Sequence, residues 1–282
     1  MSSALHDLPD TSADSVTYVD DVVAALDTAG AIVVRNVVDD AFVSETQAAL
    51  YRAQHTIRLH IDSGRLAAAG ELGVVRVPMK WEEHFFRFFE LPAVLAVIDA
   101  TVGDTAICHL QNGFILPSRD PNEVKSSVFQ NTMHRDFPRY LNGYLASVNT
   151  FFAMSDFTSK SGGTRLLPCT QQRPDSWSPS EEDEHRAIDF TCPPGTMLVF
   201  DSTIWHAAGD NVSGSDRLAV NHQWTKSFFK QQIDYVRALG DPVVLSQQPR
   251  TQQLLGWYTR MVTSLEDFYR PAEERLYRAG QG

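Results

Sequence analysis

A histidine and an aspartate stand two residues apart in the stretch QNTMHRDFPRY, residues 130 to 140. Residues i and i+2 of a strand share one face, so on a strand His134 and Asp136 can hold one metal ion while Arg135 points away. An ion pair is the simpler interpretation, because a His-x-Asp triplet is short enough to occur by chance. The rest of the chain must therefore decide between a metal site and an ion pair.

A second histidine supplies a third candidate ligand. His206, in VFDSTIWHAAGD, ends a strongly apolar predicted strand beside a polar loop, where it can face a cavity. Two histidines and one carboxylate on one face of an ion form the facial triad of non-haem Fe(II) oxygenases, with positions left open for a cosubstrate and dioxygen. A zinc hydrolase can use the same residues, but the sequence has no helical H-E-x-x-H motif. We therefore predict His134, Asp136 and His206 as metal ligands and catalytic residues, with iron and zinc both open at this point.

One arginine bears on the cosubstrate. An oxygenase that uses 2-oxoglutarate must hold the far carboxylate of that molecule, and the planar guanidinium of arginine matches a carboxylate with two parallel hydrogen bonds. Arg217 lies eleven residues after His206, past a turn and at the start of the predicted strand RLAVNHQW. An arginine at a strand start is usually a surface residue. Its order and spacing relative to the three candidate ligands nevertheless favour a cosubstrate anchor.

Short predicted strands fill the region from about residue 105 to 226 and would position these residues. Turn-forming Gly, Pro, Asn and Asp separate them, and the segments are TAICHLQNGFIL, SSVFQNTMHRD, YLASVNTFFAMSDF, GGTRLLP, AIDFTC, TMLVFDSTIWHAA and RLAVNHQWTKSFF. Many short strands with turn signals predict a sandwich or barrel-like double sheet. The sequence has no Rossmann or phosphate-loop glycine pattern, and SGG at 161–163 is predicted as a turn.

Helical segments flank the predicted strands. One helix is expected to end at Gly30, before the β-branched run AIVVRNVV, and its apolar positions are Val16, Val19, Val22 and Leu26. Asp39 or Asp40 is expected to cap a longer helix. The apolar side of that helix comprises Phe42, Thr46, Ala49, Leu50, Ala53 and Ile57. The aromatic segment that follows is broken at Pro92, which predicts two short helices packed on a sheet.

The composition limits the class of protein. A chain of 282 residues with 43% hydrophobic residues suits one domain, and we predict a single oxygenase domain over 1–282. Within it we expect a disordered leader at 1–15, a double-sheet core at about 105–226 and a helical tail at about 227–282. The net charge is −11 with no basic cluster, so neither nucleic acid nor an anionic membrane is an expected partner.

The cysteines and the N-terminal segment bear on location. The three cysteines lack C-x-x-C spacing, which argues against a disulfide framework or a zinc knuckle and favours a reducing cytoplasm. The first residues carry no signal-peptide pattern, and no apolar run approaches the length of a membrane span. We predict a soluble cytoplasmic protein, and the sequence gives no indication of its oligomeric state.

Several motifs, in their order along the chain, carry a family resemblance. They are GAIVVRNVVDDAFVSETQAAL, MHRD, SDFTSKSGGTRLLPCTQQ, PPGTMLVFDSTIWHAAGDNVSGSDRLAVNHQW and, in the tail, QQLLGWYTRMVTSLEDF. With them the chain resembles the phytanoyl-CoA dioxygenase-like family of Fe(II)/2-oxoglutarate-dependent oxygenases. The resemblance implies a mainly β fold with flanking helices, built on a double-stranded β-helix (jelly-roll, cupin-like) core. It implies iron at His134, Asp136 and His206, 2-oxoglutarate at Arg217, and Fe(II), 2-oxoglutarate and O2 as cofactors.

The chain departs from the family pattern beside the cosubstrate. Ala208 stands where many members carry a Ser or Thr that helps to bind the far carboxylate, so Arg217 needs other helpers. Asn131 matches a position where relatives often place an amide near the cosubstrate, with Gln130 as second choice. Asp136 argues against a halogenase, because such relatives replace the carboxylate with a small residue to make room for halide.

The predicted reaction is hydroxylation of a C–H bond in a small metabolite or biosynthetic intermediate, with decarboxylation of 2-oxoglutarate to succinate. Desaturation, epimerisation and cyclisation are alternative outcomes. Candidate substrate contacts are Arg76, Phe137 and Asn221, although a surface pair, a core aromatic and a buried strand amide are simpler interpretations of each. Two other classes stay open: a cupin-like metalloenzyme that does not use 2-oxoglutarate, and a non-catalytic double-sheet binding protein.

Overall fold

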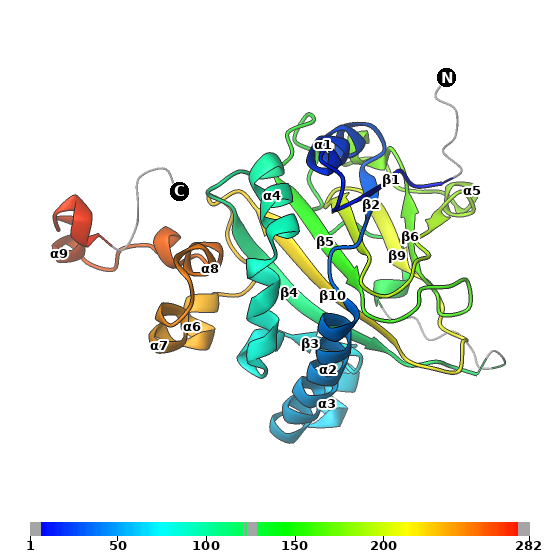
Figure 1. The fold of residues 1–282 in the computed structure, drawn as a ribbon, viewed down its shortest axis with the longest axis horizontal. Coiled ribbons are helices and arrows are strands. Elements are labelled where there is room, and N and C mark those ends of the chain that lie inside the picture. Colours follow the sequence, from blue (N-terminus) through cyan, green and yellow to red (C-terminus); the bar gives the residue numbers. More distant parts are fainter. Residues whose placement is uncertain (1–6, 121, 123–128, 276–282) are drawn as a thin grey trace.

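Two β sheets form the centre of the computed structural model, which describes residues 7–120, 122 and 129–275 (Figure 1). The large sheet has the order β1-β2-β8-β5-β10-β4-β3, and the small sheet has the order β7-β6-β9. The strands of the large sheet are β1 (Asp10–Ser12), β2 (Ala31–Arg35), β3 (Val74–Arg76), β4 (Ile107–Leu116), β5 (Ser147–Ala153), β8 (Met197–Asp201) and β10 (Arg217–Thr225). Those of the small sheet are β6 (Thr164–Leu167), β7 (Ile188–Asp189) and β9 (Trp205–Ala208).

Helices cover one face of the large sheet, and a run of short helices follows β10 (Figure 1). Before the central strands come α1 (Tyr18–Thr28), α2 (Asp40–His60), α3 (Ser63–Ala68) and α4 (Pro92–Thr101), with the 3₁₀ helices η1 (Pro78–Lys80) and η2 (Glu83–Glu90). Within the central region lie η3 (Phe129–Asn131), η4 (Thr170–Gln172) and α5 (Glu181–Glu184). The tail comprises α6 (Tyr235–Leu239), α7 (Asp241–Leu245), α8 (Pro249–Leu254), η5 (Trp257–Thr259), α9 (Leu265–Phe268) and η6 (Ala272–Glu274).

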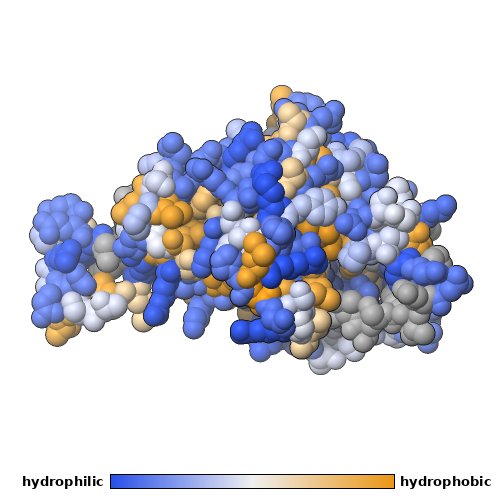
Figure 2. Space-filling model, turned by 90° about the horizontal axis from the view of Figure 1, so that it is seen from below, coloured by the Kyte–Doolittle hydropathy of each residue, from blue (hydrophilic) through white to orange (hydrophobic). Residues whose placement is uncertain are grey.

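The surface carries no extended apolar face in the view from below. Figure 2 shows hydrophobic residues in small groups among hydrophilic ones. Among the described residues, no helix is both long enough and apolar enough to cross a membrane.

The longest helix forms for the predicted reasons. The carboxylate of Asp39 accepts a hydrogen bond from the backbone N–H of Phe42 at 2.8 Å, which caps α2. Its buried side contains every predicted position, namely Phe42, Thr46, Ala49, Leu50, Ala53 and Ile57. The first predicted helix was wrong at its start, because α1 begins at Tyr18 and Val16 is fully exposed.

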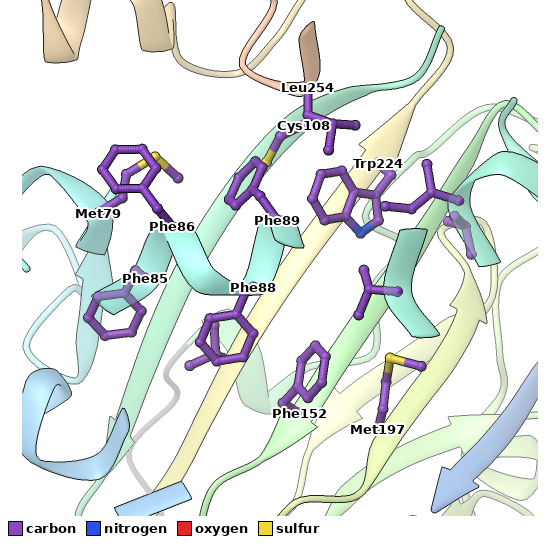
Figure 3. Close-up of a cluster of buried hydrophobic side chains, with 14 of the residues drawn as sticks. Met79, Phe85, Phe86, Phe88, Phe89, Cys108, Phe152, Met197, Trp224 and Leu254 are labelled. Atoms are coloured by element: carbon purple, nitrogen blue, oxygen red, sulfur yellow. The ribbon is translucent and has the colours of Figure 1, made fainter. Parts of the chain in front are cut away.

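An aromatic cluster fixes the helical layer on the large sheet (Figure 3). Side chains three residues apart eclipse one another in a 3₁₀ helix, and in η2 the rings of Phe85 and Phe88 accordingly stack with centroids 6.3 Å apart. Phe88 meets Phe152 of β5 edge-on at 5.0 Å, and Phe89 meets Trp224 of β10 at 5.2 Å. The aromatic segment therefore joins the helical layer to the central strands.

Three expectations about chain organisation need correction. The disordered leader predicted for residues 1–15 was wrong at Asp10–Ser12, which pair in parallel with β2, while residues 1–6 lie outside the described residues. The large sheet also draws on β1, β2 and β3, all of which precede the core predicted at about 105–226. The single strand predicted over 196–208 is two strands in different sheets, because a turn at 201–204 separates β8 from β9.

Candidate active site

The three predicted metal ligands converge at the small sheet. One ligand atom from each of His134, Asp136 and His206 lies within 4.8 Å of the others. Nε2 of His134 lies 3.7 Å from Oδ1 of Asp136, and Nε2 of His206 lies 3.8 Å from Oδ2. Among the described residues, this is the one group of three or more His, Cys, Asp or Glu side chains able to hold a metal ion.

Backbone carbonyls orient both imidazoles. Nδ1 of His134 lies 2.8 Å from the carbonyl oxygen of Thr132, and Nδ1 of His206 lies 3.0 Å from that of Ile204. A carbonyl only accepts, so each Nδ1 carries the proton and each Nε2 keeps its lone pair for a metal. Burial lowers the pKa of His206, which favours the neutral, metal-binding imidazole.

The backbone around His134 differs from the prediction. We expected residues 126–136 to form a strand, but 126–128 lie outside the described residues and Phe129–Asn131 form η3. His134 makes only an isolated antiparallel bridge with His206, with N···O distances of 2.9 and 3.0 Å in the two directions. This single bridge holds the loop against β9, so that the two histidine rings lie with centroids 4.4 Å apart.

Arg217 lies in the same cavity as the three candidate ligands. The cavity has a volume of about 180 Å³, and its lining includes His134, Asp136, His206 and Arg217. Arg217 is the first residue of β10, and only 5% of its surface is exposed. The predicted return of β10 toward His206 is therefore present in the fold.

The guanidinium of Arg217 has an unusual environment. Its Nε and Nη1 are buried and have no hydrogen-bond partner within the described part of the chain, and its guanidinium carbon lies 5.1 Å from the centre of the Phe157 ring. Burial lowers the pKa of Arg217 to about 10, so the group stays charged at neutral pH. A buried cation without an anion is costly, which makes this cavity suited to a carboxylate ligand.

The other residues predicted to contact cosubstrate or substrate divide into two groups. Gln130, Arg76 and Asn221 line the cavity, whereas Asn131 and Phe137 are not part of its lining. The ring of Phe137 instead meets Phe229 edge-on at 5.1 Å. Asn131 nevertheless has a buried Oδ1 without a hydrogen-bond partner among the described residues, so the predicted order of Asn131 and Gln130 stays a prediction.

Arg76 already has partners. Its Nε and Nη2 lie 2.9 and 2.6 Å from the two carboxylate oxygens of Glu71. Once the Asn112 amide is oriented to satisfy its neighbours, its oxygen accepts from Nη1 of Arg76 at 2.8 Å. Arg76 is thus neutralised at the cavity wall, in contrast to Arg217.

Sequence reasoning missed three polar residues of the site. Asn149 on β5 donates from Nδ2 to Oδ2 of Asp136 at 2.7 Å, and Ser202 donates to Oδ1 of Asn149. Thr164 on β6 lines the cavity and pairs in register with Ala208 on β9. Asn149 was detectable as a polar residue inside the apolar run VNTFF, but its contact with Asp136 depends on the path of the 134–140 loop.

Together the fold and the site define a class of protein: a double-sheet β fold that brings two histidines, one carboxylate and a buried arginine into one cavity. Residues 26–219 match the model of the phytanoyl-CoA dioxygenase (PhyH) family, and the chain belongs to this family. The protein is accordingly a non-haem oxygenase that uses Fe(II), 2-oxoglutarate and O2, as predicted. The two other classes that the sequence left open are set aside.

Relatives by sequence support this assignment. The chain is 53% identical over 271 residues to an uncharacterised protein of Mycobacterium tuberculosis, covering 94% of this chain and 97% of the relative. It is 22% identical to the dioxygenase andF of Emericella variicolor, over 94% of this chain and 91% of the relative.

Solved structures share the fold. The iron-bound EctD of S. alaskensis superposes with a TM-score of 0.60 at 16% identity, covering 81% of this chain and 83% of that protein. The non-haem α-ketoglutarate-dependent epimerase SnoN from nogalamycin biosynthesis superposes with a TM-score of 0.55 at 15% identity, covering 75% and 83%. The predicted jelly-roll fold class is confirmed.

Proposed function

We propose that this oxygenase hydroxylates a C–H bond of a small metabolite or biosynthetic intermediate, with iron held by His134, Asp136 and His206. The observation that carries the proposal is the convergence of these three side chains with Arg217 in one cavity. The two imidazole nitrogens and the carboxylate suit Fe(II). The guanidinium of Arg217 suits a carboxylate.

The residues present fit the cofactors. Both imidazoles offer Nε2 with a lone pair, and the carboxylate of Asp136 adds an oxygen, which together make a facial set of ligands. Nε and Nη1 of Arg217, which have no hydrogen-bond partner among the described residues, fit the far carboxylate of 2-oxoglutarate. When bound, Fe(II) and 2-oxoglutarate supply the oxidation of the substrate C–H bond by O2, with release of succinate and carbon dioxide.

The chain itself supplies binding, orientation and exclusion of water. Arg217 anchors the cosubstrate from the wall of the cavity, and Phe151 and Phe200 give the lining two nearly buried aromatic side chains. Apolar walls strengthen the pairing of a carboxylate with Arg217, because they exclude competing water. The site thereby favours a cosubstrate with a charged end.

We further propose that Thr164 replaces the hydroxyl that is missing at position 208. Thr164 lies directly across from Ala208 in the pairing of β6 with β9, and both residues line the cavity with Arg217. A threonine hydroxyl can donate to the same carboxylate that Arg217 holds. Gln130 and Asn221 are two of the four amides of the lining, beside Asn112 and Gln232, and stay candidates for contacts with cosubstrate or substrate.

The organisation and location stay as proposed from the sequence. We propose one oxygenase domain, because helices from both ends of the chain share one hydrophobic core with the large sheet. We keep the cytoplasm as the proposed location, because all three cysteines are free thiols.

Succinate formation tests the proposal. With Fe(II), 2-oxoglutarate and O2, the protein is expected to form succinate, and Asp136→Ala is expected to reduce this to the level of the metal-free protein. Asp189→Ala is the matched control, because that carboxylate is half-exposed and pairs with Arg165 on the small sheet outside the cavity lining. Full succinate formation by Asp136→Ala would contradict the ligand assignment. In a separate screen of substrates, a product that has gained one oxygen atom would identify hydroxylation.

A further inference from the structure

A chain of buried hydrogen bonds ends at the candidate iron-binding carboxylate. It runs over the face of β5 and β10 that looks toward the small sheet, where alternate residues of both strands are polar. Its members are almost fully buried, with exposures of 1% or less: Gln223, Ser147, Ser202 and Asn149. Buried polar groups are retained in a core when each finds a partner, and here the partners form a line that leads to Asp136.

The direction of each bond follows from the number of hydrogens available. Gln223 donates from Nε2 to Oγ of Ser147 at 2.9 Å. The hydroxyls of Ser147 and Ser202 lie 2.8 Å apart, and Ser202 uses its single hydrogen to donate to Oδ1 of Asn149. Ser147 must therefore donate to Ser202, so every bond points toward Asn149.

Asn149 distributes its two N–H groups to two residues of the cavity. Nδ2 donates to Oδ2 of Asp136 at 2.7 Å and to Oδ1 of Asn221 at 3.2 Å. The opposite amide orientation would set the oxygen of Asn149 against a carboxylate and a carbonyl, neither of which donates. The carboxylate of Asp136 thus selects this orientation, and the hydroxyl of Ser202 satisfies the amide oxygen that faces it.

We propose that Asn149 is a positioning residue, which leaves Oδ1 of Asp136 as the iron-binding oxygen and the amide N–H of Asn221 free to donate into the cavity. This inference rests on the proposed ligand set. Because Oδ2 already accepts from Asn149, Oδ1 would be the oxygen that the carboxylate offers to iron. Because Oδ1 of Asn221 accepts from Asn149, the side chain of Asn221 offers its amide N–H to a ligand in the cavity.

The test replaces Asn149 with an apolar side chain of similar size. Asn149→Leu removes the donor to Asp136, and we expect Fe(II) to bind about 10- to 100-fold more weakly, the range typical when a partner of a metal ligand is lost. The measurement is the Fe(II) dissociation constant, from anaerobic competition with a chromophoric chelator. Thermal unfolding of the metal-free protein is followed in parallel.

Thr150→Val is the matched control. Thr150 follows Asn149 on β5, is fully buried, and points to the opposite face, where it accepts from Nε1 of Trp224 at 2.9 Å. The Thr150→Val substitution should lower the unfolding temperature, because a buried hydrogen bond is lost, and should leave the Fe(II) affinity unchanged. Weakened iron binding in Asn149→Leu but not in Thr150→Val supports the inference, whereas equal affinity of Asn149→Leu and wild type overturns it.

A second variant keeps the test decisive if Asn149→Leu does not fold. Ser202→Ala frees the amide of Asn149 to rotate, and Fe(II) should then bind several-fold more weakly. An unchanged dissociation constant for Ser202→Ala would overturn the inference while wild-type iron binding still supports the proposed function. Absence of iron binding by the wild-type protein would instead contradict the proposed function itself.

Discussion

The two faces of β10 show how one strand serves two purposes. On the face toward the helices, Leu218, Val220 and Trp224 belong to the main hydrophobic cluster. On the other face, Arg217 and Asn221 line the cavity. All of these residues are buried, so burial alone does not distinguish core from site; what distinguishes Arg217 is a buried charged group whose Nε and Nη1 have no hydrogen-bond partner among the described residues.

His222 and Arg217 make this contrast most clearly. His222 is fully buried on the helical face, where its Nε2 lies 2.8 Å from Nε2 of Gln111 and its ring stacks on Trp224. Its Nδ1 and the Nε and Nη1 of Arg217 all lack a hydrogen-bond partner among the described residues. Burial lowers the pKa of His222 to about 3, so that its ring stays neutral at neutral pH, whereas Arg217 stays charged. A buried neutral ring is tolerated in the core, whereas a buried charge without an anion suits a charged ligand.

The largest expected change in stability tests the helical face. Phe88→Ala removes a ring that contacts Phe85 and Phe152, and the free energy of unfolding should fall by about 3–5 kcal/mol. Phe268→Ala is the control, because 45% of the surface of that residue is exposed and its effect should stay within about 0.5 kcal/mol. Urea unfolding measures both, and a loss below about 1 kcal/mol for Phe88→Ala would contradict the assigned core.

A change of opposite sign is expected on the site face. Arg217→Met removes a buried cation that has no ion-pair partner among the described residues, so the cofactor-free protein should become more stable by about 1–4 kcal/mol, while 2-oxoglutarate binding to the Fe(II) protein weakens about 100-fold. Arg35→Met, at a half-exposed pair with Asp10, should change both quantities little. Thermal unfolding and titration with 2-oxoglutarate measure the two effects. Destabilisation together with unchanged binding would show that Arg217 is structural.

The smallest expected effect depends on pH and concerns His222. Burial lowers the pKa of His222 to about 3 from the usual 6.5, so below pH 6.5 the unfolded chain takes up a proton that the folded protein does not. Stability from this residue is therefore complete above pH 6.5 and is lost as the pH falls toward 3, by about 1.4 kcal/mol at pH 5.5. His222→Gln should lose less stability than wild type between pH 7.5 and 5.5, as measured by urea unfolding of the metal-free protein. Equal losses would show that His222 is not the group that titrates.

The sequence predicted the features that depend on residue type and local period. The buried side of α2 follows from spacing along a single element. The set of His134, Asp136 and His206 was expected from the ligand preferences of iron, although the strand expected to carry the first two is a loop joined to β9 by one bridge. The same reasoning identified Arg217, because a return strand after a turn brings its first residue back to the site.

Features that depend on pairing between distant strands were not predictable. The contact of Asn149 with Asp136 requires the loop at 134–140, which is tied to a strand by one isolated β bridge at His134. The position of Thr164 opposite Ala208 requires the register of β6 with β9. The separation of β8 from β9 depends on one turn, in which the carboxylate of Asp201 accepts from the backbone N–H of Thr203 at 2.8 Å. Nothing in single-strand periodicity specifies any of these three.

The central claim is that one cavity holds both the iron and the 2-oxoglutarate. Its most direct test is an anaerobic titration of the Fe(II)-loaded protein with 2-oxoglutarate, followed by the weak visible charge-transfer band of the chelate. The band is expected in the wild-type protein and is expected to be absent in His206→Ala. Iron binding without a band in the wild type, or an undiminished band in His206→Ala, would contradict the account.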